Sequence, residues 1–316
     1  MSPVSPANPA PRHITVVGRG LIGSALTAAL RRDAATVHTV ARSGARTAHH
    51  EPCDLGTRHG RDALRAALRR QQPDRVVLTH GPSDVTWMEN HPEDAAEAHA
   101  GLARAVSEEF GPRILLVSTD NVYPGTDPLR TPADPPAPAN VYGHVKLAAE
   151  QAVLDAGGHV VRVSLVYGGW SPPGQRVTFA ERCLAAARAG QPLAAPEDQW
   201  FTPVHLDDVT TVLRAMCGPG VDRSAVEPLS HLSGPRQLSR HDFALAAYRL
   251  AGADEALVTP VPRARSEWAS RPRYSSLHCD DFAPVTGIPG WQPADVTDGL
   301  RTMLTTAPAL AEAVTR

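Results

Sequence analysis

A tyrosine and a lysine stand four residues apart in Tyr142-Gly-His-Val-Lys146, inside a segment that can form a helix. On a helix this spacing places both side chains on one face, one turn apart. A lysine ammonium close to a phenol stabilises the phenolate, so we expect the pKa of Tyr142 to be lowered. Such a tyrosine could exchange a proton near neutral pH. The same spacing also occurs by chance on solvated helix faces, so its meaning depends on the elements around it.

A glycine-rich loop near the start of the chain predicts where a cofactor would bind. The β-branched run His13–Gly18 predicts a buried strand, and apolar residues at 21–30 recur at helical spacing. The glycines between them allow a tight turn, close approach of the backbone to a pyrophosphate, and close packing of helix on strand. The N-terminus of the helix favours phosphate groups. This G-x-G-x-x-G pattern predicts a dinucleotide site that contains Gly18, Gly20, Leu21, Ile22 and Gly23.

The residues that follow the second predicted strand, Thr36–Val40, indicate which nicotinamide cofactor would bind. NAD sites usually place an acidic residue here, bonded to the ribose hydroxyls. In this chain Arg42 would attract a 2′-phosphate and Ser43 could hydrogen-bond it, with assistance from Arg46. We therefore favour NADP(H) over NAD(H), although an exposed loop arginine would leave the same pattern. We also assign Asp54 and Leu55, at the end of a short predicted strand, to this site, with Asp54 facing the adenine.

Strand and helix patterns alternate along the first half of the chain. Helices are predicted at 61–72, 92–110 and 140–156, and apolar strands at 75–79, 113–118 and 159–166. This alternation predicts a parallel sheet with helices on both faces, the Rossmann-type doubly wound α/β fold. Ligands of such sheets bind at the carboxyl ends of the strands. One strand ends there in Thr79 and is followed by His80-Gly81, and another ends in Ser118-Thr119.

The alternation also predicts how the chain is divided. We expect residues 12–167 to form a cofactor-binding domain, with 203–234 returning to it. The alternation weakens after residue 167, and residues 168–202 and 235–316 are expected to form a smaller, mixed α/β lobe that binds substrate. There Ser239 is expected to cap a helix that runs to Leu250. Residues 1–11 contain four prolines and no apolar run, so we expect a disordered lead-in and no signal peptide.

Composition limits the classes of partner. A chain of 316 residues with 42% hydrophobic residues and a net charge of -2 fits a globular protein and gives no reason to expect nucleic acid or a membrane surface. No apolar run approaches the length of a membrane span. The four cysteines lie far apart and no secretion signal is present, so we expect reduced cysteines and a cytoplasmic protein. The fourteen histidines lack metal-binding spacing, and no metal site is predicted.

Several motifs together resemble one family. The glycine loop, a Ser/Thr-rich strand end, Tyr-x-x-x-Lys, and an arginine-containing strand that ends in Tyr167-Gly168 stand in the order typical of extended short-chain dehydrogenases/reductases. Two segments, Ser118–Gly125 and Asn140–Ala148, are similar to the dTDP-4-dehydrorhamnose reductase branch, the sugar-nucleotide reductases. The resemblance runs from about His13 to the C-terminal helix, and its motifs are clearest before Tyr167.

The resemblance implies reduction, by NADPH, of the 4-keto group of a dTDP-type 4-keto-6-deoxyhexose. It implies that Tyr142 is the general acid, that Lys146 lowers its pKa and holds the nicotinamide ribose, and that Thr119 hydrogen-bonds the same carbonyl oxygen. Segment 79–81 and Leu165 would contact the cofactor. The substrate contacts implied by the resemblance are Trp87, Asn121, Arg176, Trp200 and Arg273.

Two histidines depart from the family pattern. His80 stands where most relatives have small residues, and His99 stands where many short-chain reductases place an asparagine that supports a proton relay. Two other activities stay open: an NAD-retaining epimerase or dehydratase of the same fold, and a regulatory subunit that binds NADP without turnover. The catalytic residue types favour an enzyme. The assembly also stays open, with a homodimer among the alternatives.

Overall fold

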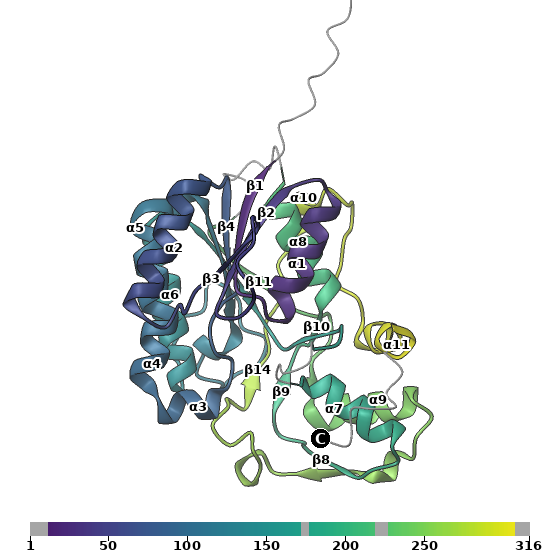
Figure 1. The fold of residues 1–316 in the computed structure, drawn as a ribbon. Coiled ribbons are helices and arrows are strands. Elements are labelled where there is room, and N and C mark those ends of the chain that lie inside the picture. The colour runs from purple at the N-terminus through teal and green to yellow at the C-terminus, as the bar shows by residue number, and fades with distance from the viewer. Residues whose placement is uncertain (1–11, 172–176, 219–226, 307–316) are drawn as a thin grey trace, which may run out of the picture.

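A parallel sheet of seven strands forms the centre of the computed structural model, which describes residues 12–171, 177–218 and 227–306 (Figure 1). The strand order is β11-β6-β5-β4-β1-β2-β3, and all neighbouring strands are parallel. The strands are β1 (His13–Val17), β2 (Thr36–Ala41), β3 (His50–Pro52), β4 (Arg75–Leu78), β5 (Ile114–Thr119), β6 (His159–Val163) and β11 (Leu229–Leu232). The predicted Rossmann-type fold class is therefore confirmed. The predicted lead-in, 1–11, lies outside the described residues.

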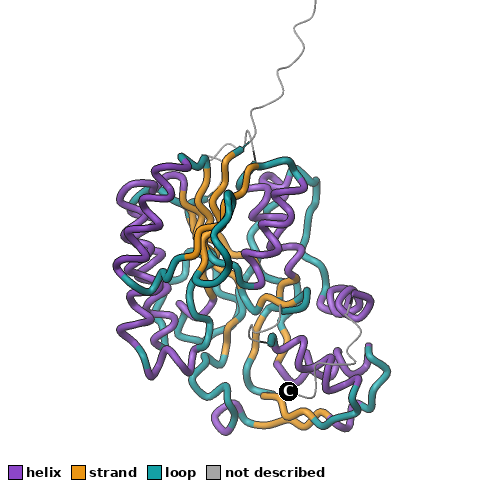
Figure 2. Tube along the Cα trace, in the orientation of Figure 1, coloured by secondary structure: helices purple, strands orange, loops and turns teal. Residues whose placement is uncertain are grey.

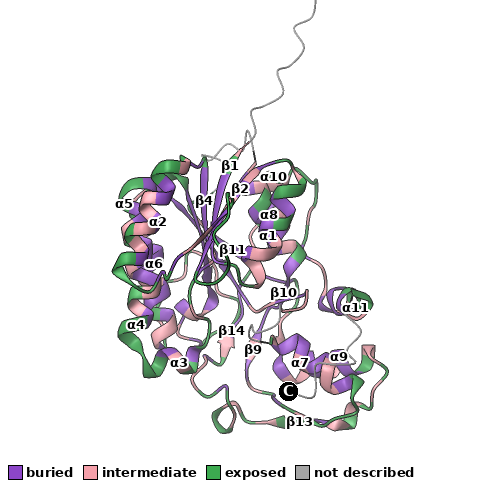
Figure 3. Cartoon of the chain, viewed as in Figure 1, coloured by how far each residue is buried: buried purple, intermediate pink, exposed green. Residues whose placement is uncertain are grey.

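Helices cover both faces of this sheet (Figure 1). One face carries α2 (Arg58–Gln71), α5 (Leu102–Phe110) and α6 (Val141–Asp155), and the other carries α1 (Leu21–Arg32), α8 (Leu206–Met216) and the short α10 (Ala283–Thr286). Successive strand side chains point to opposite faces, so Val16 and Val17 lie in different hydrophobic clusters. Because both faces are covered, the strands are buried along their length while the outer helix faces are exposed (Figure 3).

The predicted helix at 92–110 is interrupted in the structure. It consists of α4 (Pro92–Ala96), a π-helical turn at Glu97–Gly101, and α5; the short α3 (Val85–Asn90) precedes it. A π turn closes its hydrogen bonds one residue further along than an α-helix and is frequent at functional sites. The turn holds His99 in a buried position. Apolar periodicity does not report which carbonyl a backbone N–H group chooses, so the sequence pattern could not predict this turn.

The second lobe is built from short strands and helices (Figure 2). Its small sheets are β12-β9-β14, β13-β8 and β10-β7, and its core contains Phe201, Phe243 and Trp268. The prediction that Ser239 caps a helix ending at Leu250 is confirmed, because Ser239 forms a capping box with Asp242 at the start of α9. The elements are β7 (Val166–Tyr167), α7 (Phe179–Arg188), β8 (Leu193–Pro196), β9 (Trp200–Phe201), β10 (Val204–His205), β12 (Leu238–Ser239), α9 (Arg240–Leu250), β13 (Val258–Val261), β14 (Tyr274–Ser275) and α11 (Val296–Thr306).

Two elements that lie between the lobe's β10 and β12 in the sequence, α8 and β11, belong to the large sheet and its helix layer. Helix α8 packs on α1, and β11 pairs with β6 at the edge of the sheet. Four short 3-10 turns complete the described structure: 111–113, Asp120–Val122, 255–257 and 263–265. In the described ranges, every helix is too short or too polar to pass through a bilayer.

A buried ion pair joins α6 to the sheet. Glu150 on α6 accepts hydrogen bonds from Arg162 on β6, with an Nη2–Oε2 distance of 2.6 Å, and from Ser118 on β5. Arg162 also donates to the Tyr123 hydroxyl at 2.6 Å, which lies 3.0 Å from Nε2 of His231 on β11. Each charge in this network therefore has several polar partners, as a buried ion pair requires.

We expect Glu150→Gln to lower the free energy of unfolding by about 3–5 kcal/mol, because Arg162 would remain charged and buried without its carboxylate. Urea denaturation followed by circular dichroism measures this difference. Asp298→Asn is the matched control, since it breaks the ion pair with Arg301 that is exposed on both sides, and it should change stability by less than about 0.5 kcal/mol. Equal effects of the two variants would contradict the importance of the buried pair.

Candidate active site

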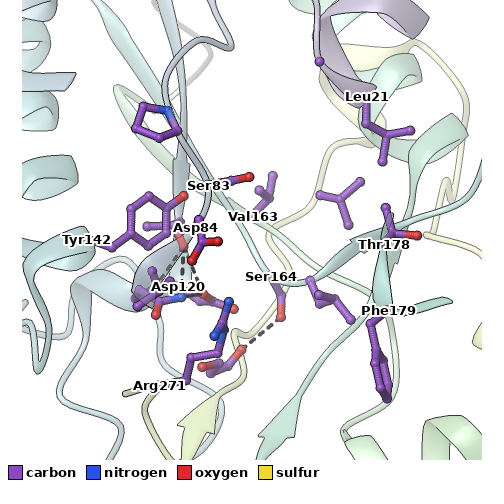
Figure 4. Close-up of a pocket in the computed structure, with 18 of the residues that line it drawn as sticks. Leu21, Ser83, Asp84, Asp120, Tyr142, Val163, Ser164, Thr178, Phe179 and Arg271 are labelled. Carbon is purple, nitrogen blue, oxygen red and sulfur yellow. Dashed lines mark hydrogen bonds between the residues drawn. The ribbon is translucent and has the colours of Figure 1, made fainter. Parts of the chain in front are cut away.

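A cavity of about 970 Å³ lies at the carboxyl ends of the parallel strands and extends to the second lobe. The sheet contributes the loops after β1, β4 and β5 and the end of β6, and α7, α9 and the segment before β14 contribute from the lobe. In Figure 4, Tyr142 and Asp120 lie across the cavity from Leu21 and Phe179. This is the position where doubly wound sheets bind ligands.

The first turn of α6 is fastened to the end of β5. Asn140 caps the helix by accepting from the Gly143 N–H at 2.8 Å, and its amide donates to the Asn121 side chain at 3.1 Å. A Cβ atom at Gly143 would overlap the carbonyl oxygen of Asn121, so only glycine permits this approach. The close contact brings Tyr142 of α6 beside Thr119 at the end of β5. Both residues and Lys146 line the cavity.

Burial determines the proton affinities of this group. The pKa of Tyr142 is raised to about 12 because burial disfavours the phenolate, and a hydrogen bond with Thr119 only partly opposes this. The pKa of Lys146 is lowered to about 8, also by burial, with the charge of Glu150 opposing. The Lys146 ammonium donates to the Val117 carbonyl at 2.7 Å. The expectation that Tyr142 has a lowered pKa is therefore wrong for this structure, and Tyr142 retains its proton at neutral pH.

The end of β5 carries a second titratable group. Asp120 begins the 3-10 turn that follows Thr119 and is buried in the cavity wall. Its Oδ1 accepts from the Asn121 side chain at 2.6 Å and from Thr119 at 3.1 Å (Figure 4). The pKa of Asp120 is raised to about 6, because burial outweighs its hydrogen bonds and the charge of Arg240.

The glycines of the loop have different roles, some in packing and one in lining the cavity. A Cβ atom at Gly23 would overlap the Gly18 carbonyl oxygen, and Gly18 has a φ of +108° against the backbone of His80. These two glycines therefore serve the packing of β1, α1 and β4, and they do not line the cavity. By contrast, an added Cβ at Gly20 meets no described atom within 4 Å. Gly20, Leu21 and Ile22 line the cavity at the N-terminus of α1.

The predicted cofactor contacts beyond the glycine loop are placed in two groups. Arg42, Thr79, His80, Gly81 and Leu165 line the cavity together with Gly20. Ser43, Asp54 and Leu55 do not line it: the Ser43 carbonyl lies 3.0 Å from His50 Nε2, Asp54 forms the turn before α2, and Leu55 packs in the core. Arg46 forms an ion pair with Glu51. Arg19 belongs to the glycine loop, and its guanidinium lies against Gly44, two residues after Arg42.

The two histidines that depart from the family pattern lie together close to Tyr142. The rings of His80 and His99 are 5.9 Å apart, and His99 is 6.0 Å from the ring of Tyr142. Burial lowers the pKa of His99 to about 3 and that of His80 well below its usual value, so both rings are neutral. An added Cβ at Gly81 would overlap the His99 ring. Gly81 also has a φ of +105°, so both its backbone conformation and the nearby His99 ring favour glycine at this position.

The predicted substrate residues differ in whether they line the cavity. Asn121 lines the cavity, and Arg176 lies outside the described residues. Trp87 stacks on His91 at 4.7 Å, Trp200 pairs in the small sheet of the lobe, and the exposed Arg273 lies over the Tyr274 ring at 5.4 Å. The last three do not appear in the cavity lining.

The lobe instead presents a basic and aromatic cluster that the sequence analysis missed. It consists of Phe179, Arg182, Arg240, Trp268 and Arg271, and all five line the cavity. In a regular extended segment residues 271 and 273 would point to the same side. In the structure only Arg271 lines the cavity and Arg273 is exposed, because the segment before β14 is not a regular strand.

Arg240 is the most deeply buried member of this cluster, with 4% of its surface exposed. Its guanidinium lies 3.6 Å from the centre of the Trp268 ring, and its Nε donates to Gln199 at 2.6 Å. Its Nη1 has no hydrogen-bond partner in the part of the chain that the structure describes. Burial, followed by repulsion from Arg271, lowers its pKa well below the usual value. The neighbouring Arg182 is paired with Glu267 at 2.6 Å.

Comparison with known proteins agrees with this arrangement. The model of the RmlD substrate binding domain family matches residues 12–306. The chain belongs to this family. It is 30% identical over 247 residues to dTDP-4-dehydrorhamnose reductase of Escherichia coli, covering 73% of this chain and 80% of the relative. It is also 27% identical over 223 residues to the bovine (Bos taurus) methionine adenosyltransferase 2 subunit beta, covering 66% of this chain and 64% of the relative.

The RmlD-type fold is shared with solved structures. A crystal structure of dTDP-4-dehydrorhamnose reductase from Bacillus anthracis in complex with NADP superposes with a TM-score of 0.76. It covers 94% of this chain and 100% of that chain, at 20% sequence identity. Family membership makes the chain an NAD(P)-dependent oxidoreductase of the short-chain type, as its motifs imply.

Two glycine variants separate the packing and binding roles of the loop. We expect Gly20→Ala to leave the melting temperature within about 2 °C of the wild type but to weaken NADPH binding about tenfold or more, because the new methyl group would occupy the approach to a pyrophosphate. Gly23→Ala should instead lower the melting temperature, since its Cβ overlaps backbone. Thermal unfolding and NADPH fluorescence titration measure the two effects. Equal loss of stability in both variants would contradict the division.

Proposed function

We propose that this protein reduces, with NADPH, the 4-keto group of a nucleotide-linked 4-keto-6-deoxyhexose of the dTDP type. The observation that carries the proposal is the grouping of Thr119, Tyr142 and Lys146 on the wall of a cavity that also contains the glycine loop. The name of the E. coli relative supports the same reaction class. A cytoplasmic location and a homodimer are parts of the proposal that rest on the sequence and the family alone.

The residues present fit a dinucleotide. Gly20 leaves open space at the N-terminus of α1, where backbone N–H groups favour phosphate, and Thr79–Gly81 and Lys146 would hold the nicotinamide end. When bound, NADPH supplies a hydride. Arg42, with Arg19 close to the same loop, would favour the 2′-phosphate that distinguishes NADPH from NADH. The NADP named in the Bacillus anthracis structure supports this preference.

The protein side chains handle the proton. A ketone that accepts a hydride develops negative charge on its oxygen, and this charge must be stabilised where it forms. Tyr142 still carries its proton at neutral pH, so it is suited to donate to that oxygen as a general acid. Lys146, with a pKa of about 8, is mainly cationic at pH 7 and stabilises the phenolate that remains.

The substrate side of the proposal rests on the basic cluster of the lobe. Three arginines, Arg182, Arg240 and Arg271, surround Trp268 in the cavity wall, and Arg182 is paired there with Glu267. Among the described residues, the Nη1 group of the buried Arg240 has no hydrogen-bond partner. A diphosphate would supply the missing acceptor and charge, and Trp268 and Phe179 offer apolar surface to a base. A nucleotide-linked ketone fits this cluster better than a free sugar does.

Of two other functions considered, one has specific support. The bovine relative is named as a subunit of another enzyme, so a regulatory protein that binds NADP without turnover is the second candidate. An epimerase or dehydratase of the same fold would retain NAD, but Arg42 stands where such enzymes prefer an acidic residue. Tight NADPH binding without hydride transfer would support the regulatory protein, and stoichiometric NAD in the purified protein would support the epimerase.

The reductase is tested by following NADPH absorbance at 340 nm with a dTDP-4-keto-6-deoxyhexose. We expect turnover in the wild type and a loss of about 10²–10⁴-fold in kcat for Tyr142→Phe, with a smaller change in KM, because the general acid is removed while binding contacts remain. Tyr274→Phe is the matched control, since Tyr274 does not line the cavity. A wild type that oxidises no NADPH with this ketone would sink the proposal.

The cofactor preference is tested at Arg42. We expect Arg42→Ala to raise the KM for NADPH about tenfold or more and to leave the KM for NADH nearly unchanged, since only NADPH carries the 2′-phosphate. Arg46→Ala should change neither value, because Arg46 is exposed and paired with Glu51. If Arg42→Ala changes both cofactors equally, Arg42 does not recognise the 2′-phosphate.

A further inference from the structure

The hydroxyl group of Thr119 has more neighbours than one hydroxyl can donate to. Its oxygen lies 3.1 Å from Asp120 Oδ1, and 3.2 Å from both the backbone N and the side-chain Nδ2 of Asn121. It also shares a hydrogen bond with the Tyr142 side chain. Figure 4 shows Asp120 and Tyr142 on the same wall of the cavity. A threonine hydroxyl carries one proton and two lone pairs, so these contacts compete.

The donors and acceptors can be assigned by elimination. Both Asn121 nitrogens are donors, so each can only approach a lone pair of the Thr119 oxygen. The Asn121 Nδ2 group also donates to Asp120 Oδ1, and this bond, at 2.6 Å, is shorter than its 3.2 Å contact with Thr119. The Thr119 proton therefore has two acceptors to choose between, the Asp120 carboxylate and the Tyr142 oxygen. An ionised carboxylate is the stronger acceptor. With Asp120 ionised, Thr119 donates to Asp120 and can only accept a proton from Tyr142.

This assignment affects a general acid directly. While Thr119 accepts, the Tyr142 O–H points to Thr119 and not to a ketone. When Tyr142 gives up its proton, the phenolate needs a donor, and the Thr119 hydroxyl already shares a hydrogen bond with it. We propose that Asp120 is a positioning residue that acts through Thr119: its carboxyl group determines whether the Thr119 hydroxyl donates away from Tyr142 or toward it.

The surroundings of Asp120 allow it to change state in a useful range. Its pKa is raised to about 6 because burial disfavours the carboxylate, while Thr119, Asn121, Ser164 and the charge of Arg240 oppose the rise. Below this pH a protonated Asp120 no longer takes the Thr119 proton; above it, the carboxylate does. The other titratable and charged side chains that line the cavity from neighbouring elements are Tyr142 and Lys146 of α6, His80, Asp84 and His99 of the segments after β4, Arg182 of α7, Arg240 of α9, and Glu267 and Arg271 before β14.

The hydrogen bond itself can be tested without substrate or cofactor. Aspartate labelled with ¹³C in its carboxyl carbon reports each pKa by NMR titration between pH 4 and 8, and the Asp120 signal is the one that disappears in Asp120→Asn. We expect Thr119→Val to raise the pKa of Asp120 by about one unit, because a donor to the carboxylate is lost. Thr119→Ser, which keeps the hydroxyl, should restore the wild-type value. An unchanged pKa in Thr119→Val would overturn the assignment.

The effect of Asp120 on the reaction is tested by a double-mutant cycle, and this part of the proposal rests on the proposed reductase function. We expect wild-type kcat/KM to rise about threefold or more as the pH falls through 6, and Asp120→Asn, which cannot ionise, to lose this inflection. In a Thr119→Val background the same Asp120 substitution should have no further effect on the profile, and in a Thr119→Ser background its effect should return.

The outcomes of the two experiments separate the proposals. An inflection that survives in Asp120→Asn, or an Asp120 effect that persists without the Thr119 hydroxyl, would overturn the positioning role. A wild type without reductase activity would overturn the proposed function and with it any role in that reaction, while the NMR titration would still decide the hydrogen bond. Circular dichroism of each variant shows whether its fold is retained.

Discussion

The contact between the first turn of α6 and the end of β5 is the constraint on which the site depends. Gly143 lets the helix approach the Asn121 carbonyl, and Asn140 joins the helix cap to the Asn121 side chain. Two turns further along α6, the buried pair of Glu150 and Arg162 ties the same helix to β5 and β6. Through these contacts, Tyr142 and Thr119, which are far apart in sequence and belong to a helix and a strand, reach hydrogen-bonding distance.

The packing that joins these elements also buries Tyr142 and Lys146, and this burial shifts their pKa values. The site gives Tyr142 a raised pKa and Lys146 a lowered one, because both ionised forms lose water when the helix packs on the sheet. An acid that retains its proton suits a reduction, in which the ketone oxygen gains charge and needs a donor. Asp120 is buried by the same packing, and its raised pKa links the orientation of Thr119 to the pH.

The lobe contributes positive charge to the cavity. Its arginines come from α7, α9 and the segment before β14, and they meet around Trp268 because α7 packs on α9 and the sheet of β12, β9 and β14 joins the other segments. A buried guanidinium with an unpaired N–H group is costly unless an anion completes its surroundings. The sheet domain thus presents a dinucleotide site and a proton donor, while the lobe presents cations. A substrate with a ketone at one end and phosphates at the other would contact both.

The sequence alone determined the features that depend on local chemistry: the alternation that builds the parallel sheet, the glycine loop at β1, the Ser239 cap, and the motifs that show the family. These follow from periodicity and from residue types that only certain backbone conformations accept. The tertiary structure decided which arginine faces the cavity, the π turn that buries His99, and the direction of the Tyr142 shift. These depend on packing between distant segments, because desolvation and side-chain direction are set by neighbours that no local pattern records.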